Sequence, residues 1–300
     1  MKKIPIIIDT DPGVDDFFCI ALACTYSNIF DLKAITTIGG NNSTDVTTQN
    51  ALNILKLFNQ ENIPVAKGHH SYIENEFGEP VAKFHGENGL GNVVLKQSDK
   101  SVDPLQALDK IYEIAKKCNG ELVLVTVGPE TNLGLAFNKY PDLKQLIKKI
   151  VVMGGSLTTG NVSEYAEANI YHDALAAKIV FESGIPIDMI GLNVTRKAPL
   201  KLNIFDGLNN IDPIIKDVIE KLIIFRNEEA MHDAIAISSL IRDDIIVFKE
   251  AHTTIINDNS IKQGMTLVEY DKPINSRVAI DINVENYYEL MRDMLLHYSK

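Results

Sequence analysis

The chain has 300 residues, and its 29 basic against 40 acidic side chains leave a formal net charge of -11. This acidic balance argues against nucleic acid as the main partner, because phosphate binding needs a basic surface. No apolar run approaches the ~18 residues of a membrane-spanning helix, while 45% hydrophobic residues suffice for a large core. We therefore expect a soluble globular enzyme with no nucleic-acid or membrane partner.

The first half of the chain alternates strand-like and helix-like segments. In order, the sequence predicts a strand over 4–8, a helix over 17–23, a strand over 32–38 and a helix over 44–58. The run over 4–8 is continuously apolar, as in a strand buried on both faces. Residues 67–102 show no periodicity, and so long a loop in a compact domain is usually functional.

The alternation continues through the second half. The predicted elements are a helix over 104–117, a strand over 122–127, a helix over 132–138, a strand over 150–153, a loop over 154–169, a helix over 173–182, a strand over 187–192, helices over 214–225 and 234–240, short β patterns over 245–282 and a helix over 285–297. This order is typical of βαβ units. We predict an α/β fold: one domain over residues 1–300 with a central, mostly parallel, open, Rossmann-like sheet flanked by helices.

Two features bear on the cellular compartment. The basic N-terminus resembles the start of a signal peptide, but the apolar stretch that follows is short and stops at Asp9. The cysteines Cys19, Cys24 and Cys118 are odd in number and lack metal-site spacing, which indicates reduced thiols. We expect a cytoplasmic protein.

The most informative segment is DTDPGVDD over residues 9–16, between a predicted buried strand and a helix. One or two aspartates at a helix start are common as caps. Four carboxylates in eight residues exceed what capping needs, and they repel one another. A bound cation is the obvious neutraliser, so the segment predicts a metal site.

The same segment has features of two other kinds of metal-binding loop. An EF-hand loop is excluded, because Ile20 would occupy the position of the bidentate Glu and a strand precedes the loop. A Mg²⁺-dependent phosphohydrolase with Asp9 as nucleophile and Asp11 beside it stays open as an alternative. It leaves the second aspartate pair without a role.

Further polar clusters follow the other predicted strands. Asn41, the segment GPETN over 128–132 and the segment MGG over 153–155 each lie where a strand ends. In open parallel sheets, ligands bind beyond the carboxyl ends of the strands. These clusters therefore predict one pocket, although each polar residue alone is more commonly a solvated loop residue or a cap.

Taken in order, these motifs resemble the inosine-uridine preferring nucleoside hydrolases. The matching segments are residues 9–16, 40–41, 85–91, 128–132, 153–155, 160–161, 166–169 and 232–233. The resemblance implies the nucleoside hydrolase fold and an N-glycosyl hydrolase that splits a pyrimidine or inosine-type ribonucleoside into ribose and free base. It also implies a homodimer or homotetramer and a role in nucleoside salvage or catabolism.

The resemblance also assigns roles to individual residues. It implies Ca²⁺ ligands at Asp11, Asp16, the Val127 carbonyl and Asp233; a substrate-binding set of Asp15, Asn41, Asn161, Glu167 and Asn169 with Met153 packed on the sugar; and His85 and His232 near the base. Hard oxygen ligands suit Ca²⁺ or Mg²⁺ and not Zn²⁺. Because Ca²⁺ takes ~6–8 oxygens, positions remain for the ribose diol and a water.

A mechanism follows from this arrangement. The metal lowers the pKa of its bound water, and Asp11 accepts the proton as general base. Cleavage passes through an oxocarbenium-like sugar, and His232 is the candidate acid for the leaving base. A catalytically silent nucleoside-binding protein stays open as a third interpretation.

Several positions depart from the family pattern. Ala168 stands where relatives often have Phe, and Asn193 replaces a frequent Asp. The chain has no Trp, and no Tyr lies between Phe205 and His232, the segment expected to close over the base. Phe225 is the aromatic residue that remains there, and its helical spacing fits a core position equally well.

Overall fold

The structure is a computed structural model that describes residues 2–74, 76, 78 and 82–299. Its strands are β1 (Ile4–Thr10), β2 (Phe30–Thr37), β3 (Val65–Lys67), β4 (Leu122–Thr126), β5 (Ile147–Met153), β6 (Ile187–Ile190), β7 (Ile246–Ile255), β8 (Thr266–Glu269) and β9 (Ser276–Ile282). They form one sheet in the order β3-β2-β1-β4-β5-β6-β9-β7-β8. Neighbours from β3 across to β9 are parallel, whereas β7 pairs antiparallel with β9 and β8. The predicted α/β class and mostly parallel sheet are confirmed.

The apolar strand sequences account for burial of the sheet on both faces. In β1, Ile6 and Ile8 belong to one hydrophobic cluster and Ile7 belongs to the other. The same alternation separates Val123 from Leu124 in β4. Because successive side chains of a strand point to opposite faces, a continuous apolar run needs cover on both sides.

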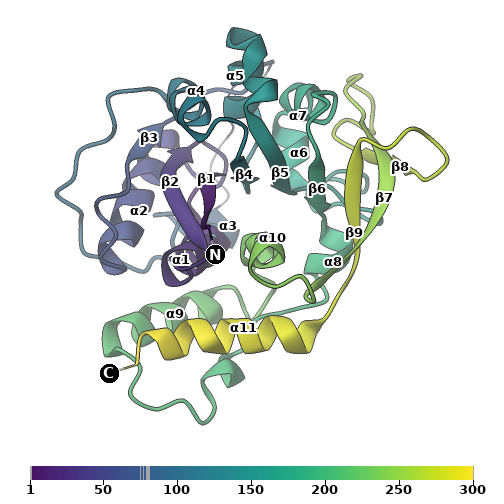
Figure 1. Cartoon of the computed structure of the whole chain (residues 1–300). Helices are drawn as coiled ribbons and strands as arrows, with labels where there is room; N and C mark the ends of the chain where they lie inside the picture. The colour runs from purple at the N-terminus through teal and green to yellow at the C-terminus, as the bar shows by residue number, and fades with distance from the viewer. Residues whose placement is uncertain (1, 75, 77, 79–81, 300) are drawn as a thin grey trace.

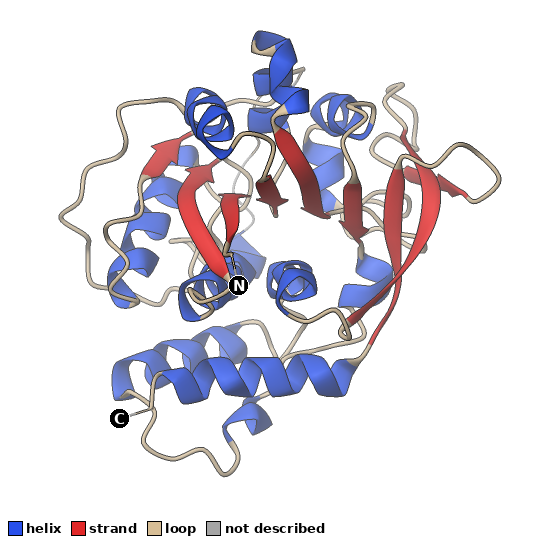
Figure 2. Cartoon of the chain, in the orientation of Figure 1, coloured by secondary structure: helices blue, strands red, loops and turns tan. Residues whose placement is uncertain are grey.

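Helices supply that cover. Their bounds are α1 (Val14–Thr25), α2 (Thr44–Leu57), α3 (Ala82–His85), α4 (Ala107–Cys118), α5 (Thr131–Lys139), α6 (Ala168–His172), α7 (Ala174–Phe181), α8 (Leu192–Thr195), α9 (Pro213–Phe225), α10 (His232–Ile241) and α11 (Val284–His297), with 3₁₀ turns η1 (Pro141–Gln145) and η2 (Leu202–Phe205). Helices α4, α5 and α7 cover one face, and α1, α2 and α10 cover the other. Helices α9 and α11 form a further layer outside α1 and α10 (Figures 1 and 2).

Several predicted elements differ in detail from the structure. The predicted strand over 187–192 ends at Ile190, because Gly191 turns the chain into α8. The predicted loop over 154–169 ends early at α6, whose first turn is capped by the Glu167 carboxylate. The loop over 67–102 contains α3, and its residues 75, 77 and 79–81 lie outside the described residues.

The strand order places a reversal between β1 and β4. From β1 the chain moves outward through β2 to β3, and from β4 it moves the opposite way through β5 to β6. This is the switch point at which open α/β sheets bind ligands beyond their carboxyl ends. The Val127 amide donates to the Asp9 carbonyl over 2.8 Å, which ties the two strand ends together. The acidic segment therefore begins at the switch point.

Two other expectations can be compared with the structure. Within the described ranges, no helix combines the length and apolarity needed to cross a membrane. All three cysteines are free, and Cys19 and Cys24 are buried in α1. Burial raises the pKa of the Cys24 thiol to about 12, so this thiol is neutral and unreactive.

Candidate active site

A cavity of about 680 Å³ opens beyond the carboxyl ends of the parallel strands. The predicted site residues that line it are Asp15, Asn41, His85, Val127, Met153, Asn161, Glu167, Asn169, His232 and Asp233. They come from segments far apart in the sequence, as the strand-end argument predicts. Of the predicted set, Asp11 and Asp16 do not line the cavity and lie behind its wall, 2% and 0% exposed.

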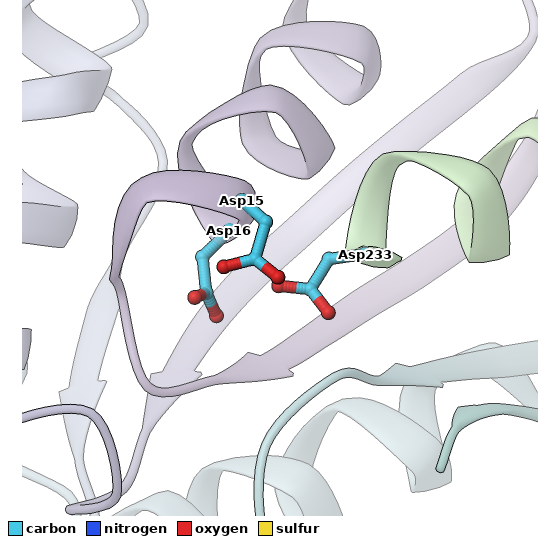
Figure 3. A group of neighbouring side chains, drawn as sticks. All are labelled: Asp15, Asp16 and Asp233. Carbon is cyan, nitrogen blue, oxygen red and sulfur yellow. The ribbon is translucent and has the colours of Figure 1, made fainter. Parts of the chain in front are cut away.

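Buried carboxylates form the floor of the site. One oxygen each from Asp15, Asp16 and Asp233 lies within 4.8 Å of the others. Figure 3 shows the three carboxylates turned toward one another, two from the start of α1 and one from the start of α10. The aspartates were predicted here, but the structure places Asp15, predicted to bind substrate, inside the carboxylate group. Three adjacent buried anions repel, and an oxygen-ligated cation is the natural counter-charge.

Asp11 lies next to this group and is held by Asn41. The Asn41 amide donates to Asp11 Oδ2 over 2.7 Å, and the Asn41 side chain donates to the Asp11 carbonyl and to Asp16 Oδ2 at 3.1 and 3.0 Å. Among the described residues, no group hydrogen-bonds to Asp11 Oδ1, although it is buried. A buried oxygen without a partner is costly, which indicates a ligand or ion at this atom.

The carboxylates raise one another's pKa. Burial, then the charge of Asp16, raises the pKa of Asp11 well above its ordinary range. Burial and the charge of Asp15 do the same for Asp233, and they raise the pKa of Asp16 to about 6. Without a counter-charge, the folded protein therefore favours the protonated forms.

Gly40 gives Asp11 the space that it needs. A Cβ atom at this position would lie 2.1 Å from Asp11 Oδ2. We expect Gly40→Ala to displace the carboxylate and to lower kcat roughly 100-fold, the loss typical of a ~1 Å misplacement. Steady-state kinetics on uridine checks this, with Gly78→Ala as the control because a Cβ there meets open space. Unchanged kcat in Gly40→Ala would show that the position of Asp11 does not matter.

The opposite wall carries amide and carboxylate groups. Glu167 caps α6, accepting from the amides of Asn169 and Gly155 at 2.9 and 3.0 Å. Asn169 Nδ2 donates to the carbonyls of Val127 and Met153 at 3.0 and 3.1 Å. Asn161 accepts from the Ala168 amide over 2.9 Å. These bonds fix the side chains in place and leave further lone pairs for a polar ligand.

The remaining wall holds His85 and His232. His85 Nδ1 accepts from the Val14 amide over 3.2 Å and lies 3.9 Å from Asp15 Oδ1. His232 Nδ1 lies 2.7 Å from the Thr195 hydroxyl. Burial lowers the pKa of both imidazoles to about 4, so both are neutral near pH 7.

The cavity is also lined by residues that the sequence did not single out: Phe84, His172, Arg196, Arg226, Glu228 and Glu229. Phe225 is not among the cavity-lining residues: it packs on the hydrophobic core, and its ring occupies the space beside Gly91. The core interpretation of Phe225 is therefore the correct one, and its neighbour Arg226 faces the cavity.

Asp9 is directed into the sheet. It is 1% exposed, and Oδ1 accepts from the Thr36 hydroxyl and from Asn132 Nδ2 at 2.5 and 2.9 Å. A carboxylate held in this way has no access to a phosphate ester in the cavity. The alternative with Asp9 as nucleophile therefore lacks its attacking group, and Asp9 instead ties β1 to β2 and α5.

A carboxylate-rich cavity at the switch point of a Rossmann-like sheet defines an α/β enzyme for a small polar substrate. The profile of the family described as inosine-uridine preferring nucleoside hydrolase matches residues 6–289. The chain belongs to this family. It is a nucleoside hydrolase, a glycosidase of the EC 3.2.2 class.

Individual relatives agree over nearly the whole chain. The pyrimidine-specific ribonucleoside hydrolase RihA of Shigella boydii serotype 4 is 32% identical over 312 residues, 99% of each chain. The solved plant nucleoside hydrolase PpNRh1 has a TM-score of 0.91 at 29% identity, over 98% of this chain and 99% of its own. The purine-preferring ribonucleoside hydrolase from Gardnerella vaginalis has a TM-score of 0.91 at 28% identity, over 97% and 98%.

Proposed function

We propose that the chain is a Ca²⁺-dependent hydrolase of pyrimidine or inosine-type ribonucleosides. The observation that carries this proposal is the buried group of Asp15, Asp16 and Asp233 at the floor of a polar cavity. The similarity to RihA, which is named a pyrimidine-specific ribonucleoside hydrolase, supports a preference for pyrimidine nucleosides. A purine-preferring structural neighbour with a similar fold makes the base preference a matter for experiment.

The donor set fits a hard divalent cation. The proposed ligands are Asp11, Asp16, the Val127 carbonyl and Asp233, which offer only oxygen, with Asp15 beside them. Asp11 Oδ1 and Asp15 Oδ1 are buried and lack hydrogen-bond partners in the described structure, as expected for atoms that face a cation. When bound, such an ion supplies positive charge that acidifies water and orients the sugar diol.

Asp11 is the proposed general base. Its buried carboxylate lies beside the proposed metal ligands, and its Oδ1 has no hydrogen-bond partner among the described residues, so it is free to accept a proton from an attacking water. The Asn41 amide holds Oδ2, so the carboxylate keeps one orientation. Proton transfer from water to Asp11 lets the water oxygen bond to ribose C1′.

The carboxylate and amide side chains that line the cavity suit the hydroxyl groups of a ribose. The proposed contacts are Asp15, Asn41, Asn161, Glu167 and Asn169, with Met153 packed on the sugar. Positive charge develops on the sugar as the bond to the base breaks, and fixed carboxylates stabilise it. His85 and His232 are proposed near the base. In the tautomer in which Nδ1 accepts from the Thr195 hydroxyl, the neutral His232 ring presents its Nε2–H as a hydrogen-bond donor to the departing base.

The direct test measures reducing sugar released from uridine, cytidine, inosine and adenosine by the purified protein. We expect ribose release from uridine, cytidine or inosine, its loss with a chelator, and recovery on adding Ca²⁺. Full activity in chelator would refute the metal requirement. Saturable nucleoside binding without products would instead identify a binding protein, and phosphate release from monoesters would revive the phosphohydrolase alternative.

A further inference from the structure

The cavity is lined by groups of both charges. The guanidinium of Arg226 lines it together with the carboxylates of Asp15, Glu167, Glu228, Glu229 and Asp233. N-glycosidic cleavage also separates charge: the sugar becomes positive while the base receives the bond electrons. A cavity that holds a buried guanidinium as well as carboxylates can therefore act on both charges.

Arg226 is held at the cavity by the chain reversal between α9 and α10. It caps α9, its backbone amide donating to the Leu222 carbonyl over 3.1 Å. Asn227 and Glu228 follow in left-handed conformations with φ of 52° and 56°. The reversal leads the chain on to His232, and both Arg226 and His232 line the cavity. The Arg226 backbone is thereby fixed.

The protein compensates the Arg226 charge incompletely. The residue is 7% exposed, and a guanidinium stays protonated at any physiological pH. Nη1 donates to the Phe84 carbonyl over 3.3 Å, and Nη2 lies 3.3 Å from a Glu229 carboxylate that is 56% exposed and therefore solvent-screened. In the described part of the chain, buried Nε has no partner. A buried, partly unpartnered donor lining a cavity indicates a ligand acceptor.

We propose that Arg226 is a catalytic residue that stabilises the negative charge developing on the departing base. This inference rests on the proposed nucleoside hydrolysis. The C1′–N bond breaks with both electrons passing to the base nitrogen, and the water oxygen bonds to C1′ as its proton passes to Asp11. Guanidinium N–H groups bind the anionic base until a proton from solvent neutralises it. A preorganised charge of this kind acts most strongly in a water-poor site.

The experiment varies the leaving group. We compare uridine, 5-fluorouridine and 4-nitrophenyl β-D-ribofuranoside, whose leaving groups become progressively more stable as anions. In Arg226→Gln, we expect kcat/KM on uridine to fall roughly 100-fold or more, with a much smaller loss on the nitrophenyl riboside. Arg226→Lys keeps the charge but not the forked geometry of the guanidinium. We expect its kcat/KM to depend on the leaving group more steeply than in the wild type and less steeply than in Arg226→Gln. Arg242→Gln removes a partly buried arginine that pairs with Asp244 and Glu289 and does not line the cavity, and it serves as the matched control.

The outcomes separate this inference from its alternatives. If Arg226 only anchored Phe84 and the neighbouring His85, its loss would lower all three rates equally. Equal losses, or unchanged rates, would overturn the inference while leaving the hydrolase function intact. A wild-type protein that cleaves none of the substrates would overturn the proposed function itself. Should circular dichroism show that Arg226→Gln does not fold, the three substrates are compared in Arg226→Lys alone. A kcat/KM that varies more steeply with leaving-group stability than in the wild type supports the inference, and a parallel variation rejects it.

Discussion

Replacing Asp11 by Asn is expected to lower kcat by about 10²–10⁴-fold, the usual contribution of a general base. The amide has nearly the same shape as the carboxylate, so its side chain still fits beside Asn41. It cannot accept a proton from water. Because the amide also removes repulsion with Asp16, we expect a folded variant whose melting temperature in chelator is at or above that of the wild type, with little ribose release from uridine.

Steady-state kinetics and thermal unfolding test this together. Asp31→Asn is the matched control, since Asp31 lies on the surface and pairs with Lys33. Calcium titration by calorimetry separates loss of the base from loss of a metal ligand. A kcat close to that of the wild type would remove Asp11 from the mechanism.

Replacing Asp233 by Asn is expected to abolish activity and to stabilise the metal-free protein. Asp233 is buried among Asp15, Asp16 and Asp11, and burial with these charges raises its pKa far above the ordinary 3.8. A neutral amide removes that repulsion. For each kcal/mol gained in the free energy of unfolding, the melting temperature in chelator should rise by roughly 2–4 °C. Added Ca²⁺, in contrast, should stabilise only the wild type.

The pH dependence of this gain has a definite sign. A carboxylate whose pKa is raised by folding leaves the folded state binding more protons than the unfolded state, so its stability falls as pH rises above 3.8. The difference in melting temperature between Asp233→Asn and the wild type should therefore be small near pH 4 and larger at pH 8. Melting curves in chelator at several pH values measure it. A constant difference, or a destabilised variant, would contradict the crowding of these carboxylates.

Much of the site was predictable because its residues follow apolar strands. The run before Asp9 predicts a doubly buried strand, and a parallel sheet brings the ends of such strands to one edge. That argument alone predicts that the acidic segment, Asn41 and the motif after β4 lie close together. The order of the strands does not predict which carboxylates lie next to one another. Asp15, predicted only as a substrate-binding residue, lies in the cluster with Asp16 and Asp233.

Other features depend on contacts that no local pattern carries. Helix α6 is short, and the Glu167 carboxylate that caps it locally is also held by the Gly155 amide at the end of β5, a contact that the sequence does not reveal. The pairing of β7 antiparallel to β9 was not predicted, since alternation of side chains is the same for either strand direction. Arg226 follows a predicted helix, but only the chain reversal after it brings the guanidinium to the cavity.

The connector between α9 and α10 joins the proposed base recognition to the proposed catalysis. Residues 226–230 place Arg226, Glu228 and Glu229 in the cavity lining and lead directly to His232 and Asp233. The Glu229 carbonyl and the Glu228 carboxylate accept from the backbone amides of Leu200 and Leu202, so the connector is tied to the segment after α8. A redesign of nucleobase choice in this connector would therefore also alter the groups that act on the sugar–base bond.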